Sequence, residues 1–223
     1  MGGQRGGACI ISRAVAEAIK LKAREIEAET TIEFLERLRA LGEEVIALEP
    51  SMASVRNAVE TILSRVKKAE AATPEECIKL VSEAADELIE RSRNAVEKIS
   101  EYGSGLIIDG DTILTHSCSH TVLKVLERAH EEGKKFRVIV TESRPLLEGR
   151  ETASELLSKS IPVTLIVDAA ICTVMRDVDK VMIGADAILA DGSIVNKVGS
   201  LPIALAAYAS NVPLIVVVES LKF

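Results

Sequence analysis

Tryptophan is absent from this 223-residue sequence, and aromatic residues make up only 2% of it. The core must therefore be aliphatic, and a hydrophobic content of 48% is enough to form one. A chain of this length is typical of one large domain or two small ones. No apolar run approaches the ~20 residues that cross a bilayer. The longest candidate, from Ile161 to Met175, is too short and contains Asp168, so no contact with a membrane is expected.

Cysteine pairs and nucleotide-binding loops are missing too. The four cysteines form no Cys-x-x-Cys motif and no signal peptide is found, which predicts reduced thiols in a cytoplasmic protein. Neither Gly-x-Gly-x-x-Gly nor Gly-x-x-x-x-Gly-Lys-[Ser/Thr] occurs, so an ordinary dinucleotide or P-loop site is not expected. The net charge of −7 repels phosphate backbones, so direct binding of nucleic acid is not expected either.

Helical periodicity fills the first part of the sequence. Apolar residues recur every three or four positions between charges, which predicts a helical N-terminal domain over residues 1–102. Gly42 is expected to break the first helical stretch. A later helix is expected to begin with Thr73 as its N-cap, Pro74 at its first position and Glu76 completing a capping box.

The periodicity changes in residues 103–223. Short β-branched runs without alternation predict strands that are buried on both faces of a sheet, and helical patterns separate them. The expected strands are DTILTH, RVIVTES, VTLIVDA, KVMIGADAI and PLIVVVES. Residues 103–223 are therefore expected to form an α/β, Rossmann-like, doubly wound domain with a mainly parallel sheet. In such sheets ligands bind beyond the carboxyl ends of the strands.

The first strand ends in the run THSCSH, which allows three interpretations. His116, Cys118 and His120 alternate and could hold a metal ion on an extended segment, but no fourth ligand follows. Ser119 is expected near the N-cap of a helix, and a turn from strand to helix would break the alternation. The other two interpretations are a capped helix with a partly buried thiol and a helix N-terminus that binds an anion. No metal or other cofactor is expected.

Other strand ends also carry polar side chains. Arg144 suits bidentate binding of a phosphate, or it pairs with a local carboxylate such as Glu142. Asp186, in a Gly-Ala-Asp turn, is either a general acid or base or a capping residue. Asn196 and Lys197 are an amide and a cation that suit sugar hydroxyls and phosphate.

These motifs together resemble one protein family. In the run RGGA at residues 5–8, a basic residue and two glycines lead into a helix, a layout that suits an anion. It is followed in order by PSMASVRNA, DTILTHS, VTESRPLLEGRETA, PVTLIVDAA, IGADAILADGSIVNKVGS and VVVESLKF. This series is similar to the family that unites the α, β and δ subunits of translation initiation factor 2B with isomerases of methylthioribose 1-phosphate and ribose 1,5-bisphosphate.

The resemblance covers nearly the whole chain and implies a helical N-terminal domain and a Rossmann-like second domain. It also implies a homo-oligomer that associates through the second domain. Family members usually extend further at both ends, so the sequence looks truncated, in particular at its C-terminal end. The implied ligand is a small phosphorylated sugar or nucleotide.

The resemblance further implies which residues act. In the isomerases, a cysteine directly after Thr-His and the aspartate of the Gly-Ala-Asp turn transfer the protons, and here the aspartate is Asp186. The positions expected to contact phosphate and sugar hold Arg5, Gly6, Gly7, Arg56, Ser117, Arg144, Asn196, Lys197 and Lys222.

Ser117 stands at the position of the family's catalytic cysteine, and Cys118 comes one residue later. A serine hydroxyl without a base beside it is a poor substitute, because its pKa is far above that of a thiol. Initiation-factor-like members of the family also replace this cysteine, and the run THSCSHTV resembles their pattern.

Two functions are therefore inferred. The first is a binding or regulatory role as an archaeal-type initiation factor 2B-like subunit, which senses the phosphorylated ligand and contacts translation initiation factor 2. Ser117 favours this function. The alternative is an aldose–ketose isomerase of the ribose 1,5-bisphosphate isomerase type, in which Asp186 exchanges a proton at oxygen and Cys118 or His116 is the base.

Overall fold

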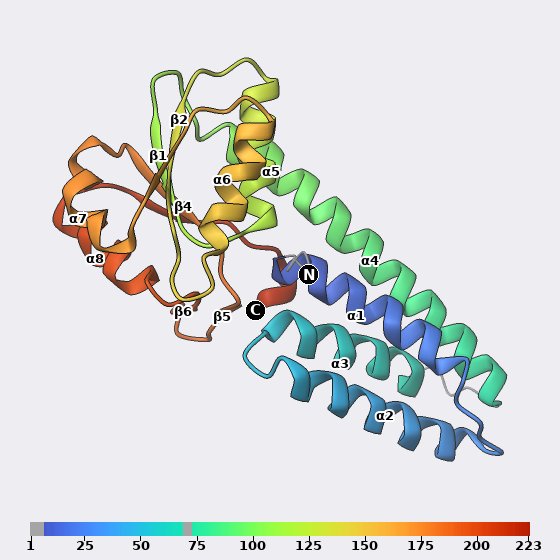
Figure 1. Ribbon diagram of the computed structural model, residues 1–223. Helices are drawn as coiled ribbons and strands as arrows, with labels where there is room; N and C mark the ends of the chain where they lie inside the picture. Colours follow the sequence, from blue (N-terminus) through green and yellow to red (C-terminus); the bar gives the residue numbers. More distant parts are fainter. Residues whose placement is uncertain (1–6, 69–72) are drawn as a thin grey trace. The chain divides into compact units, whose positions relative to one another are not determined.

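The computed structural model describes residues 7–68 and 73–223, which form two compact units (Figure 1). The helical unit comprises Ala8–Ala95 together with Ser220–Phe223. The sheet unit comprises Gly7 and Val96–Glu219. Helix α4 (Pro74–Ser104) begins in the helical unit and ends in the sheet unit.

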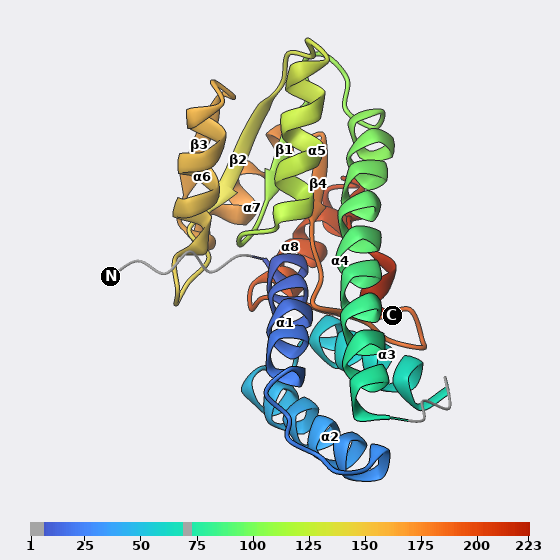
Figure 2. The same cartoon turned by 90° about the vertical axis from the view of Figure 1, so that its right-hand side faces the viewer.

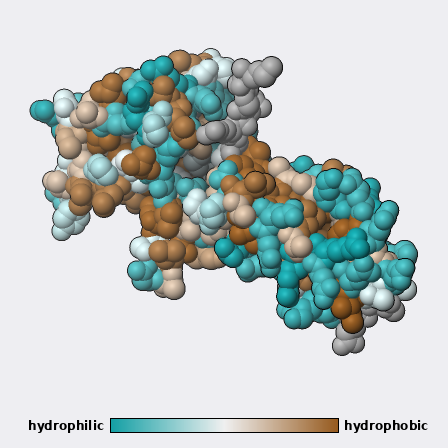
Figure 3. Space-filling model, turned by 60° about the horizontal axis from the view of Figure 1, so that its bottom comes forward, coloured by the Kyte–Doolittle hydropathy of each residue, from teal (hydrophilic) through white to brown (hydrophobic). Residues whose placement is uncertain are grey.

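Amphipathic helices build the helical unit around an aliphatic core that includes Phe34. They are α1 (Ala8–Ala23), α2 (Thr31–Leu48), α3 (Ala53–Lys68) and the first part of α4. The outer surface of this unit is largely hydrophilic on the side that Figure 3 shows. Among the described residues, no helix combines the length and apolar composition that a membrane span requires.

The expected capping box at the start of α4 is confirmed. Thr73 Oγ1 accepts a hydrogen bond from the Glu76 backbone N–H, and Glu76 Oε2 accepts one from the Thr73 backbone N–H, each at 3.2 Å. Because the pair satisfies two N–H groups that have no partner within the helix, it fixes the point at which α4 begins.

The expected break at Gly42 is wrong. The chain leaves the helical conformation at residues 24–30 instead, and Gly42 lies buried inside α2. A Cβ at Gly42 would lie 2.6 Å from Cγ1 of Val59 in α3. The glycine therefore allows two helices to approach closely, a role that its sequence context does not distinguish from a break.

The sheet unit contains five parallel strands in the order β3-β2-β1-β4-β7, which confirms the expected doubly wound sheet (Figures 1 and 2). The strands are β1 (Thr112–Thr115), β2 (Arg137–Thr141), β3 (Val163–Ile166), β4 (Lys180–Ile183) and β7 (Leu214–Val216). One face is covered by α5 (His120–Glu131) and α6 (Glu148–Ser158), and the other by α7 (Ile171–Val174) and α8 (Ser200–Ala209). Separate aliphatic clusters fill the two layers.

The strand order places the topological switch point between β1 and β4. From β1 the chain builds β2 and β3 on one side, and then β4 and β7 on the other. Ligand crevices of such sheets lie beyond the carboxyl ends of the strands that flank this point. After β4 the chain forms a hairpin of β5 (Ala187–Ile188) and β6 (Ile194–Val195), which leads to Asn196 and Lys197.

Candidate functional site

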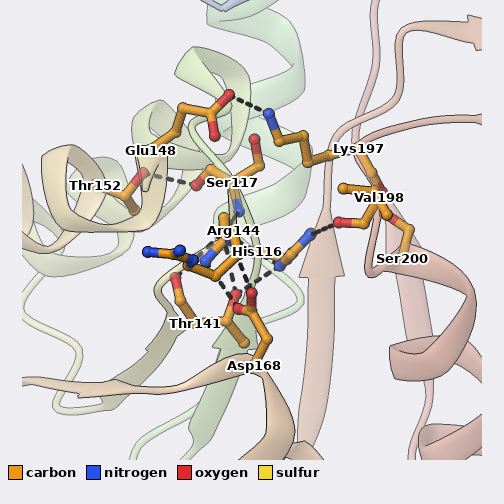
Figure 4. Close-up of polar contacts among 11 residues, drawn as sticks. His116, Ser117, Thr141, Arg144, Glu148, Thr152, Asp168, Lys197, Val198 and Ser200 are labelled. Atoms are coloured by element: carbon orange, nitrogen blue, oxygen red, sulfur yellow. Dashed lines mark hydrogen bonds and ion pairs between the residues drawn. The ribbon is translucent and has the colours of Figure 1, made fainter. Parts of the chain in front are cut away.

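His116 follows β1 directly, and both of its ring nitrogens contact protein groups (Figure 4). Nε2 lies 2.8 Å from the Val198 carbonyl oxygen, which can only accept, so Nε2 carries the proton. Nδ1 therefore accepts from Thr141 Oγ1, 2.5 Å away. Burial is the main cause that lowers the pKa of His116 below its ordinary value. The ring is thus a neutral link between the ends of β1 and β2 and the segment before α8, and neither nitrogen is open to a metal ion or to a substrate proton.

Ser117 makes the expected turn from strand to helix. Its φ of 65° is left-handed, its backbone N–H donates to Ser143 Oγ at 2.7 Å, and its carbonyl accepts from Thr152 Oγ1 at 2.8 Å. Ser119 then caps α5, whose first residue is His120. This turn breaks the alternation on which a His-Cys-His metal site would depend, and no group of acidic, His or Cys side chains suited to a metal occurs in the described ranges.

Cys118 packs against the aliphatic cluster beneath α5 and α6. Burial raises the pKa of its thiol, and the carboxylates of Glu151, Glu155 and Glu148 add to this rise, while a hydrogen bond with Thr152 acts in the opposite direction. The thiol therefore stays protonated at neutral pH and is a poor base or nucleophile.

Asp168 holds the loop that carries Arg144. The backbone N–H groups of Ser143 and Arg144 donate to Asp168 Oδ1 and Oδ2 at 2.8 and 2.7 Å. The Arg144 residue is exposed. Its expected alternative partner, Glu142, instead pairs with Arg150 at 2.6 Å, so the interpretation of Arg144 as a partner of Glu142 is wrong.

Lys197 and Glu148 form an ion pair near Ser117 (Figure 4). Lys197 Nζ lies 2.5 Å from Glu148 Oε1, and the two side chains are 18% and 15% exposed. The other oxygen, Glu148 Oε2, is buried and has no hydrogen-bond partner within the described part of the chain. Asn196 Nδ2 donates to Ser200 Oγ at 2.9 Å. Sequence reasoning missed Glu148, whose only signal was its place in the run ESRPLLEG.

Asp186 lies at the carboxyl end of β4 and is half-buried. Its backbone N–H donates to the Val195 carbonyl oxygen at 2.8 Å, and the chain continues into β5. Because a strand follows and not a helix, the interpretation of Asp186 as a helix cap is wrong. Its part in proton transfer stays a prediction.

The remaining predicted residues lie in different places. Gly7 lies against the start of α5, since a Cβ on it would be 3.1 Å from the His120 backbone nitrogen. Arg56, exposed on α3, and Lys222, buried after β7, belong to the helical unit, so their part in the pocket stays a prediction. Arg5 and Gly6 lie outside the described residues.

Comparisons with known proteins match nearly the whole chain. A family model described as the initiation factor 2 subunit family matches residues 4–223. A ribose 1,5-bisphosphate isomerase of Methanocaldococcus jannaschii is 41% identical over 217 residues, which cover 97% of this chain and 68% of that protein. An eIF-2B subunit 2-like protein of Pyrococcus furiosus is 37% identical over 217 residues, which cover 97% of this chain and 74% of that protein. A solved structure of translation initiation factor eIF-2B from Pyrococcus horikoshii OT3 has a TM-score of 0.88 at 33% identity, covering 99% of this chain and 76% of that one.

Proposed function

The chain belongs to the initiation factor 2 subunit family, and on this basis we propose that it binds a phosphorylated pentose beyond the carboxyl ends of its strands and interconverts the aldose and ketose forms. This reverses the order of the two functions inferred from the sequence. The reason is that the similar isomerase of M. jannaschii is 41% identical to this chain, against 37% for the initiation-factor-like protein of P. furiosus.

Charged groups beyond the carboxyl ends of the strands carry the proposal. Arg144 and Lys197 supply positive charge at the switch-point edge of the sheet, which suits a phosphate group. The buried oxygen Glu148 Oε2 has no donor among the described residues, and a ligand hydroxyl would supply one. A phosphorylated polyol combines both kinds of group in one small molecule.

Asp186 is the group in the predicted set that suits the proton transfers. Isomerisation of ribose 1,5-bisphosphate breaks the bond between C1 and the ring oxygen, moves the proton on C2 to C1, and moves the proton of the C2 hydroxyl to the released ring oxygen, which leaves a ketone at C2. The Ser117 backbone N–H donates to the Ser143 hydroxyl and the Ser117 carbonyl accepts from the Thr152 hydroxyl, and neither hydroxyl is a base. Burial raises the pKa of the Cys118 thiol, which makes this thiol a poor base too. In this proposal the Asp186 carboxylate carries the two protons in turn, one from the C2 hydroxyl to the released ring oxygen and one from C2 to C1.

Incubation with ribose 1,5-bisphosphate, followed by NMR detection of ribulose 1,5-bisphosphate, tests the proposal. Turnover is expected in the unchanged protein. It should vanish in Asp186→Asn with ligand binding retained, and it should fall in Arg144→Ala, which weakens ligand binding. A protein that binds the bisphosphate tightly but never converts it would contradict the isomerase function.

That outcome would support the second candidate, a binding or regulatory subunit that contacts translation initiation factor 2. Two observations together favour it: a serine, Ser117, stands at the cysteine position, and the thiol of the next residue, Cys118, is half-buried and protonated. In this case the phosphorylated sugar or nucleotide is an effector and not a substrate.

We also propose that the chain forms a homo-oligomer through α8. The segment SLPIALAAYA contains no charged residue, and Leu201, Leu205 and Tyr208 are 69%, 60% and 86% exposed. These three residues follow helical spacing and therefore form one stripe. A helix that is apolar on all sides is typical of burial in an assembly.

A further inference from the structure

Asp168 was not among the predicted site residues, yet its carboxylate contacts the loop before Arg144 at two points. Oδ1 accepts from the Ser143 backbone N–H at 2.8 Å, and Oδ2 accepts from the Arg144 backbone N–H at 2.7 Å. Two bonds to consecutive N–H groups fix the position and the orientation of the peptide plane that precedes Arg144. Hydrogen bonds to a charged acceptor are stronger than those between neutral groups.

This loop begins where sheet pairing ends. The last bond from β2 toward β3 is donated by the Glu142 backbone N–H to the Ile166 carbonyl oxygen at 2.8 Å. Ser143 then adopts a left-handed φ of 63° without being glycine. Such a conformation is strained for a residue with a Cβ and persists where the surroundings fix it. Asp168 lies two residues after Ile166. Its carboxylate replaces the β3 backbone as the hydrogen-bond acceptor and fixes this conformation.

Ser143 extends this support to the neighbouring strand end. Its Oγ accepts from the Ser117 backbone N–H at 2.7 Å and lies 3.2 Å from His116 Nδ1. One network therefore joins the carboxyl ends of β1, β2 and the segment after β3, with Asp168 at its outer end (Figure 4).

We propose that Asp168 is a positioning residue for binding of the phosphorylated ligand. It acts through the backbone of Ser143 and Arg144 and does not touch the ligand itself. Bidentate binding of a phosphate by Arg144 depends on the placement of its backbone, and this placement is what Asp168 fixes. The inference rests on the proposed function, specifically on binding of a phosphorylated ligand at Arg144, and not on turnover.

The substitution Asp168→Asn separates this role from packing. The amide has nearly the size of the carboxylate but retains one acceptor oxygen, so one of the two backbone N–H groups then faces an NH2 group. Asp177→Asn is the matched control, because Asp177 is an exposed carboxylate in η2 (Met175–Asp177), after the same strand.

A double-mutant cycle with Arg144→Ala is the test, made in the Asp186→Asn background so that the ligand is not converted, with the dissociation constant of ribose 1,5-bisphosphate measured by calorimetry. Asp168→Asn alone is expected to weaken binding ~10-fold, the size expected for one lost charge-assisted hydrogen bond. In the Arg144→Ala background the same change should cost less than about twofold, because the residue through which it acts is gone. Asp177→Asn should leave the constant unchanged.

Equal losses in both backgrounds would overturn the inference, since a general structural defect weakens binding whether or not Arg144 is present. If Asp168→Asn does not fold, Asp168→Ser, which keeps a hydroxyl acceptor, takes its place in the cycle. A protein in which Arg144→Ala weakens binding but the effects are additive contradicts only the role of Asp168. A protein that binds no phosphorylated pentose contradicts the proposed function as well.

Discussion

Lys197 Nζ lies 2.5 Å from Glu148 Oε1, so a cation proposed to bind phosphate is paired with a protein carboxylate in the described structure. Both side chains are largely buried, and the second oxygen of Glu148 has no partner in the described ranges. The pair therefore sets the charge that an incoming phosphate meets.

Replacing Glu148 with Gln should have opposite effects on stability and on anion binding. The change removes a charge-assisted hydrogen bond, so the free energy of unfolding should fall by about 1–3 kcal/mol. Loss of a negative charge beside Lys197 should also make inorganic phosphate bind several-fold more tightly. Urea unfolding and calorimetric titration measure the two quantities. Glu142→Gln is the control, because its partner Arg150 is 57% exposed and both quantities should change little. Weaker phosphate binding in Glu148→Gln would contradict the prediction.

His116 should make stability depend on pH near neutrality. Burial lowers its pKa in the folded protein, so as pH falls the unfolded chain binds this proton first. The contribution of His116 is therefore fully present above about pH 6.5, the unperturbed value, and is lost as pH falls toward the lower folded value. Urea unfolding at a series of pH values measures the slope. His116→Gln should show a smaller loss between pH 7 and pH 5, and equal slopes in the two proteins would show that the ring does not titrate as inferred.

Gly199→Ala should destabilise the fold through contact with His116. Gly199 has a left-handed φ of 107°, and a Cβ there would lie 2.7 Å from His116 Cε1. Gly192 is also left-handed, at 83°, but a Cβ added to it would have no atom within 4 Å. The difference between the two alanine variants therefore isolates the contact, and Gly199→Ala should be less stable by an additional 1–3 kcal/mol or so, the typical cost of overpacking. Equal unfolding midpoints would refute the contact.

The thiols should react in the order of their exposure and acidity. Cys172 is exposed, whereas Cys118 is half-buried and burial raises the pKa of its thiol. Iodoacetamide at pH 7.5 should label Cys172 first and Cys118 many times more slowly, as measured by mass spectrometry of digested peptides. Cys118→Ser should also leave the affinity for a phosphorylated ligand within a few-fold. Rapid labelling of Cys118, or a large loss of affinity, would show that this thiol is an open and reactive part of the pocket.

Charge placed on the α8 stripe should reduce the size of the oligomer. Leu201→Glu puts a carboxylate on a surface that the proposed assembly buries, which is strongly unfavourable without a partner charge. Sedimentation velocity should show a smaller species in this variant. Leu157→Glu is the control, since Leu157 is 59% exposed on α6. A protein whose sedimentation is the same with and without Leu201→Glu does not associate through α8.

Local chemistry allowed much of the fold to be predicted from the sequence. The capping box of Thr73 and Glu76, the N-cap at Ser119 and the strands without alternation all depend on residues within a few positions of one another. Such patterns keep their meaning wherever the segment lies, because they reflect the needs of a single helix or of a strand covered on both faces. The parallel sheet, and the search for functional residues beyond the strand ends, followed from these local signals.

Only the tertiary structure decided which strand-end residues meet. Glu148 and Lys197 are 49 residues apart, and Asp168 reaches the backbone of Arg144 across 24 residues. Gly42 likewise gained its role from Val59 on another helix. A carboxylate on a helix or after a strand has the same local pattern whether it faces solvent or a cation. Its partner is set by the strand order β3-β2-β1-β4-β7, which brings distant loops to one edge of the sheet and thereby decides the charges, burial and pKa values there.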